Sequence, residues 1–62
     1  MTEYQNLPNN PAMLLSFVNT QLRDNYPSFS ELVAAFHADA DAITEKLKMI
    51  DYEYDETQNQ FV

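Results

Sequence analysis

The spacing of the apolar residues changes once along this chain, and that change most restricts the fold it can adopt. Between residues 11 and 50 apolar side chains recur at the spacing of an α-helix. After Ile50 the spacing becomes that of a half-buried β-strand, because Tyr52 and Tyr54 alternate with acidic residues. We therefore predict a mainly α-helical fold with a β-hairpin at its C-terminal end.

Helix-start sequences divide the first part of the chain into three helices. Asn10 is a strong N-cap residue, and Pro11 is favoured at the first helical position. Ser28 and Glu31 have the spacing of a capping box, in which each side chain bonds to the other residue's N–H. Asp39 is another good N-cap. The predicted helices cover about residues 11–24, 28–37 and 39–49.

The apolar residues predicted to face the core are unevenly shared among these helices. Those of the first helix cover an arc of roughly 200° at 100° per residue, which predicts a central helix covered on two sides. They are Met13, Leu14, Leu15, Phe17, Val18 and Leu22. The inward residues of the other two helices are Phe29, Leu32, Val33 and Phe36, then Ile43, Leu47 and Ile50.

The predicted hairpin covers about residues 52–62, with a turn formed by residues 55–59. A hairpin of two strands is marginally stable by itself, so its aromatic residues should pack on the helices. We expect Tyr54 and Phe61 to be substantially buried against the first helix, with Tyr52 also leaning on the helices. The chain contains no glycine. Left-handed backbone positions, which usually end helices, must therefore be filled by Asn, Asp or His.

The length of 62 residues predicts one domain over residues 1–62, with residues 1–9 as a polar arm. The absence of cysteine favours a reducing compartment. The N-terminus has no basic and apolar regions of a signal peptide, and no apolar run approaches the ~20 residues of a membrane span. These features predict a cytoplasmic protein that is neither exported nor embedded in a membrane.

The charge balance restricts the partners that this protein can bind. Ten acidic residues face Arg23, Lys46 and Lys48, and the formal net charge is −7 at pH 7. Such a field repels nucleic acid and anionic lipid surfaces. The expected partner is therefore a protein, or a second copy of the chain in a homodimer, and neither nucleic acid nor a membrane.

The second and third predicted helices have the spacing of a helix-turn-helix pair, and the hairpin makes the layout similar to a winged helix. The residues that carry this spacing are Leu32, Phe36, Ala38, Asp39, Ile43 and Leu47. The third helix would present Ala40, Asp41, Thr44, Glu45 and Lys48 outward. That face lacks the Arg, Asn and Gln side chains that read bases, so the fold is predicted without the chemistry of DNA binding.

Catalytic, cofactor and metal sites are not predicted. His37 is the single histidine, and we interpret it as a helix-ending residue rather than a catalytic one. The acidic residues 51, 53, 55 and 56 lie at the spacing of a solvated strand, which does not wrap a cation. The chain also lacks a phosphate-binding glycine loop and the motifs of common hydrolases. We therefore predict a protein that is not an enzyme and that needs no cofactor.

A polar strip on the first helix is the candidate partner surface, and it consists of Ser16, Asn19, Thr20 and Arg23. Three interpretations are open. The strip is a solvent-exposed face, or Arg23 forms an ion pair with carboxylates of the hairpin, or the strip binds a partner. An exposed ion pair would contribute at most about 1 kcal/mol.

Residues 10–24 and 52–62 resemble a family of short bacterial proteins known as domain of unknown function 4250. With the pattern of residues 28–47 between them, the resemblance covers nearly the whole chain. It implies a bacterial origin but no activity, ligand or partner. Members of the family often carry glycine where this chain has Asp51, which implies a more strained end of the third helix here.

Together these patterns predict a small acidic protein-interaction or scaffold module. The alternative function is that of an accessory DNA-binding transcription regulator of the winged-helix type. The two functions differ in whether the protein binds duplex DNA.

Overall fold

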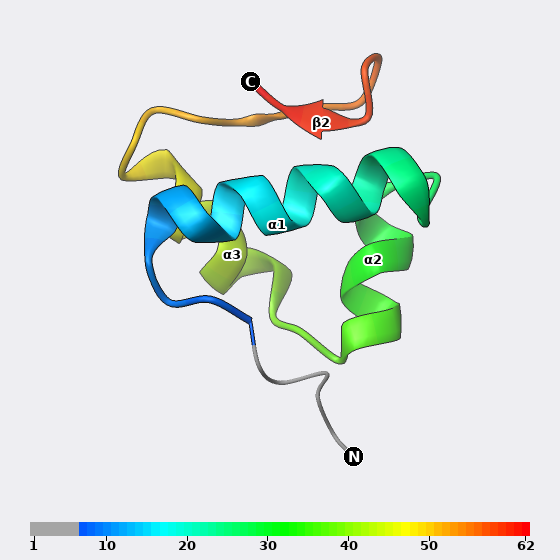
Figure 1. The fold of residues 1–62 in the computed structure, drawn as a ribbon, viewed down its shortest axis with the longest axis horizontal. Coiled ribbons are helices and arrows are strands. Elements are labelled where there is room, and N and C mark those ends of the chain that lie inside the picture. Colours follow the sequence, from blue (N-terminus) through cyan, green and yellow to red (C-terminus); the bar gives the residue numbers. More distant parts are fainter. Residues whose placement is uncertain (1–6) are drawn as a thin grey trace.

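The computed structural model describes residues 7–62 and confirms a mainly helical domain with a C-terminal hairpin (Figure 1). Its elements are α1 (Pro11–Asp24), α2 (Phe29–Phe36), α3 (Ala40–Lys48), β1 (Tyr54–Asp55) and β2 (Gln60–Phe61). This order of elements is compatible with the winged-helix-like layout. Of the predicted polar arm, residues 1–6 lie outside the described residues. Residues 7–9 have no regular structure, and Leu7 packs against the core.

Each helix begins where its capping residue predicts. Asn10 Oδ1 accepts hydrogen bonds from the N–H groups of Ala12 and Met13, at 2.9 and 3.2 Å. The Ser28 hydroxyl accepts one from the Glu31 N–H, at 3.2 Å. Within the described residues the Glu31 side chain does not return this bond, so only half of the capping box forms. Asp39 Oδ1 caps α3 by accepting bonds from two N–H groups of its first turn.

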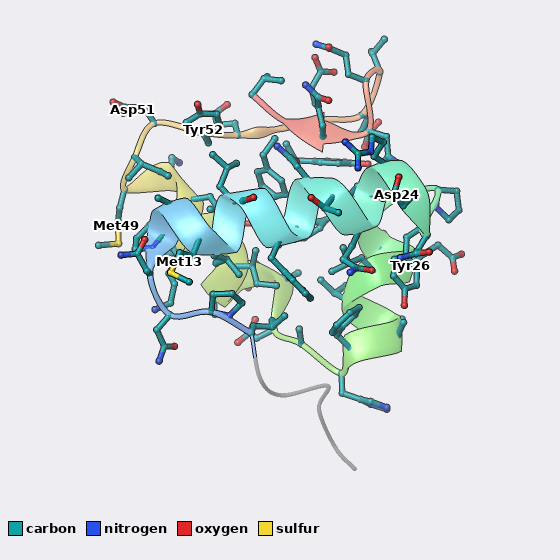
Figure 2. The ribbon with its side chains drawn as sticks, viewed as in Figure 1. Met13, Asp24, Tyr26, Met49, Asp51 and Tyr52 are labelled. Atoms are coloured by element: carbon teal, nitrogen blue, oxygen red, sulfur yellow. The ribbon has the colours of Figure 1, made fainter. Side chains whose placement is uncertain are left out.

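Helix α1 is central, as its wide apolar arc predicts. It contacts α2, α3 and β2, and Figure 1 shows the hairpin on one side of it and the other two helices on the opposite side. The buried core consists of Leu14, Val18, Leu22, Leu32, Ile43, Leu47 and Phe61. The prediction was wrong for Met13, whose side chain is 63% exposed. Met13 lies in the first turn of α1, at an end of the molecule where the described elements do not cover it (Figure 2).

Within residues 7–62, three non-glycine residues occupy the left-handed region, and they are of the predicted types. His37, Asp51 and Asn59 have φ values of 52°, 65° and 55°. At the end of α2, the reversal at His37 lets the Ala38 N–H bond the Val33 carbonyl at 2.9 Å. The reversal at Asp51 likewise lets the Tyr52 N–H bond the Leu47 carbonyl at 3.0 Å. Both bonds are those of a Schellman motif, which usually requires glycine at the reversing position.

The hairpin is shorter than predicted at its first strand. Tyr52 is not in a strand, because its N–H is held by the Leu47 carbonyl at the end of α3. Glu53 and Val62 exchange two backbone hydrogen bonds, of 2.9 and 2.8 Å. In the antiparallel register that follows, Tyr54 lies opposite Phe61.

The two aromatic residues of the hairpin differ in how deeply they are buried. Phe61 is 1% exposed and belongs to the core, and β2 contacts α1, as predicted. Tyr54 is only half-buried, and its ring lies 5.4 Å from the ring of Phe29 at the start of α2. The expectation of substantial burial is therefore confirmed for Phe61 and met only in part by Tyr54, which packs against the edge of the core. Tyr54 and Phe61 lie opposite each other in the hairpin, and the rings of both contact Phe29.

Replacement of Asp51 with glycine should stabilise the fold by about 0.5–1 kcal/mol. Glycine removes the steric cost of the left-handed backbone, which exceeds the extra entropy that it adds to the unfolded chain. Urea denaturation measures the difference, and Asp51→Ala is the matched control because it keeps the Cβ and should destabilise. Equal stability of the Gly and Ala variants would show that the backbone at residue 51 is not strained.

Candidate protein-interaction surface

Asn19, the most buried part of the predicted polar strip, holds the hairpin. Its Oδ1 accepts a hydrogen bond from the Phe61 N–H at 2.8 Å, and its Nδ2 donates one to the Phe61 carbonyl at 3.1 Å. The side-chain amide thus pairs with β2 as a neighbouring strand would. Because both backbone groups of Phe61 are satisfied in this way, the strand can lie against a helix without a third strand.

The other three residues of the strip, Ser16, Thr20 and Arg23, are exposed. Arg23 forms a two-bond ion pair with its neighbour Asp24, at 2.9 and 3.1 Å, and not with carboxylates of the hairpin. That hydrogen bonding raises the pKa of Arg23 and lowers the pKa of Asp24. The interpretation that Arg23 joins the helix to the hairpin was therefore wrong. Partner binding by the strip stays a prediction.

Asn59 and Tyr54 form a polar network that the sequence did not predict. The Tyr54 hydroxyl donates to Asn59 Oδ1 at 2.7 Å and accepts from the Phe29 N–H at 3.2 Å. Asn59 Nδ2 donates to the carbonyls of Leu22 and Tyr26, at 3.1 and 3.0 Å. The network therefore joins the hairpin turn to the end of α1 and the start of α2. The only sequence indication was an asparagine within a turn of a glycine-free chain.

The outward face of α3 carries negative charge, as predicted. Asp41, Glu45 and Lys48 are exposed, whereas Ala40 and Thr44, also predicted to face outward, are half-buried. These two residues therefore lie at the border between the exposed face of α3 and the face that packs in the fold.

An acidic hollow of about 600 Å³ lies between the end of α3 and the hairpin. Its lining residues are Lys48, Asp51, Glu53, Tyr54, Asp55, Glu56 and Val62. The Asp55 carboxylate is already used within the turn, where it accepts bonds from Gln58 Nε2 at 3.0 Å and the Thr57 N–H at 2.9 Å. These bonds, that from Gln58 above all, lower the pKa of Asp55. Among residues 7–62, no group of three or more potential ligand residues is placed to hold a metal ion.

Large apolar side chains are exposed at Met13 and Met49, and less so at Val62. Figure 2 shows Met13 and Met49 at the same end of the molecule, where α1 begins and α3 ends. Met49 was not predicted to face the core, whereas Met13 was. The pair of methionines is therefore a surface feature that only the structure reveals.

The fold and surface together define a small helical domain with a C-terminal hairpin and an acidic exterior. The chain belongs to the family described as Domain of unknown function (DUF4250), which it matches over residues 8–61. This match confirms the resemblance found in the sequence, and it includes every helix and strand described above. No curated protein and no solved structure shows a significant match to the chain. Within the described residues, no helix has the length and apolar character needed to cross a membrane.

Proposed function

We propose that this protein is a non-enzymatic, cytoplasmic protein-interaction module whose acidic surface selects a basic protein partner. The observation that carries the proposal is the exposure of Asp41 and Glu45 on α3, together with the acidic hollow that begins at Lys48, the last residue of that helix. A surface of one sign attracts and orients a partner of the opposite sign. The cytoplasmic location is supported by the cysteine-free sequence.

The positions of the basic residues favour a protein partner over DNA. Arg23 is paired with Asp24, and Lys46 Nζ donates to the Asn9 carbonyl at 3.3 Å. Lys48 is the remaining basic residue of the sequence. A DNA-binding domain typically makes about six to ten phosphate contacts, which these side chains cannot supply. The alternative function as an accessory DNA-binding regulator is supported only by the order of the elements.

Self-association is a second form of protein interaction, and its basis is weaker in the structure than in the sequence. The predicted homodimer is based on the wide apolar arc of α1 and on the many aromatic residues of a chain that is short for covering them itself. Leu14, Val18 and Leu22 are buried within the chain itself, and Phe17 packs edge-on to Phe36 at 5.6 Å. Sedimentation at increasing protein concentration distinguishes a dimer from a monomer. We propose that the monomer is the form that binds the partner.

Two titrations monitored by fluorescence anisotropy test the proposed function. One uses a labelled lysine-rich peptide and the other a labelled short DNA duplex, both at low salt. We expect the protein to bind the peptide and not the duplex, because its net charge is −7. A lysine-to-glutamate version of the peptide is the matched control and should not bind. Binding to the duplex without binding to the basic peptide would favour the regulator instead.

A further inference from the structure

We propose that Met13 and Met49 form one docking surface, the methionine surface, for a basic amphipathic helix of a partner protein. This inference rests on the proposed protein-interaction function and names the site and the chemistry of the partner. The two side chains are 63% and 74% exposed, although both belong to large apolar residues. Figure 2 shows them at one end of the molecule, together with Asp51.

Hydrogen bonds link the two segments that carry the methionines. The Met13 N–H is held by the N-cap Asn10, and the preceding Asn9 carbonyl accepts a bond from Lys46 Nζ at 3.3 Å. The Met49 N–H in turn bonds the Lys46 carbonyl at 3.2 Å. Lys46 therefore links the residue before the N-cap of α1 to the last turn of α3. Methionine is flexible and polarizable, so such a surface can adapt to the apolar face of a partner helix.

The charges around the methionine surface select a basic occupant. Glu45 lies one helical turn before Met49 and on the same face, and Asp41 lies one turn before Glu45. Asp51 follows shortly after Met49, and Glu53 is also exposed nearby in the sequence. The ammonium groups of this segment belong to Lys46, which bonds Asn9, and to Lys48. Carboxylates therefore outnumber ammonium groups by four to two in residues 41–53, the segment that carries Met49.

The same charges disfavour a second copy of this chain as the occupant. A symmetric dimer places the same patch of both copies in contact. Docking of the methionine surface on itself would bring the Glu45 and Asp51 carboxylates of both copies together, and like charges across an interface oppose association. A helix with leucine on one face and lysine on its flanks instead complements both the apolar centre and the acidic rim.

The test uses the full chain and a synthetic amphipathic helix of leucine and lysine. We expect binding of this peptide to shift the methyl NMR resonances of Met13 and Met49. The double variant Met13→Gln/Met49→Gln should bind about tenfold more weakly or worse, because it replaces apolar area with polar area. The double variant Met13→Leu/Met49→Leu is the matched control and should retain binding. Both pairs of substitutions are at exposed positions, so they should leave the fold intact.

A second comparison tests the charged rim. Glu45→Gln should weaken binding by about two- to fivefold, as expected for an exposed ion pair. Glu31→Gln removes a carboxylate from the first turn of α2 and should leave binding unchanged.

Three outcomes would overturn the inference. Equal binding by the glutamine double variant would place the peptide elsewhere, and the proposed function would survive without this site. No binding of any basic peptide would defeat the proposed function as well. Methyl shifts that depend on protein concentration without peptide would assign the methionine surface to self-association.

Discussion

Replacement of Phe61 with alanine should destabilise the protein by about 3–5 kcal/mol, the largest effect that we expect from a single substitution. The side chain is 1% exposed, and its ring packs edge-on to Phe29 at 5.1 Å. The expected loss includes both the buried ring and the cavity that it leaves. Total stabilities of about 5–15 kcal/mol are typical, and a short chain is expected near the lower end. Urea denaturation followed by circular dichroism measures the loss.

Two control substitutions test whether the loss of stability comes from the packing of the Phe61 ring and not from any change within the hairpin. Phe61→Leu keeps an apolar side chain and should cost less than Phe61→Ala. Val62→Ala changes the next residue, which is exposed, and should alter stability by no more than about 0.5 kcal/mol. If Phe61→Ala unfolds at the same urea concentration as the wild type, the hairpin does not belong to the core.

Replacement of Asn59 with alanine should cost about 2–4 kcal/mol, the second largest expected effect. It leaves the part-buried carbonyls of Leu22 and Tyr26 and the Tyr54 hydroxyl without their Asn59 partners. Alanine is also less favourable than asparagine in the left-handed region, where residue 59 has a φ of 55°. Thermal or urea unfolding measures the loss.

Asn59→Gly separates the two contributions to this loss. Glycine accepts the left-handed backbone but has no side-chain amide, so it should recover only the conformational part. Equal stability of the glycine variant and the wild type would mean that the hydrogen bonds of Asn59 contribute nothing. In that case the turn would not be fastened to α1 and α2 through the Asn59 side chain.

Local features of the sequence predicted the helices well because short-range chemistry determines where they begin and end. Asn10, Ser28 and Asp39 each cap the helix that follows them. His37 and Asp51 take the left-handed conformations that a chain without glycine requires. In each of these contacts the two partners are only a few residues apart along the chain.

Contacts between distant residues explain what the sequence could not predict. Asn19 has the spacing of a solvent-facing residue, but its amide bonds a strand 42 positions later in the chain. Tyr52 has the alternation of a strand residue, but the Leu47 carbonyl keeps it at the end of α3. Met13 has the period of a core residue, but it lies at an end of the molecule where the core stops. Periodicity describes one element, whereas these outcomes depend on how elements meet.

The acidic charge around the methionine surface was predictable from the sequence, but the location of this surface on the fold was not. The excess of acidic residues is visible in the sequence and explains the expected preference for a basic partner. The placement of Met13 and Met49 at one end depends on the packing of α1 on α3, to which the Lys46 to Asn9 hydrogen bond adds a further link. Only the fold brings these residues to one end.

A salt series of peptide binding tests the central claim, that acidic and apolar groups together select a basic helix. The Debye length falls from about 10 Å at 0.1 M salt to about 3 Å at 1 M, which weakens the attraction between exposed charges. We predict that the affinity for the leucine and lysine peptide falls several-fold over this range. A residual affinity from the methionine surface should remain at high salt and be absent from Met13→Gln/Met49→Gln. An affinity that does not change with salt would contradict the claim.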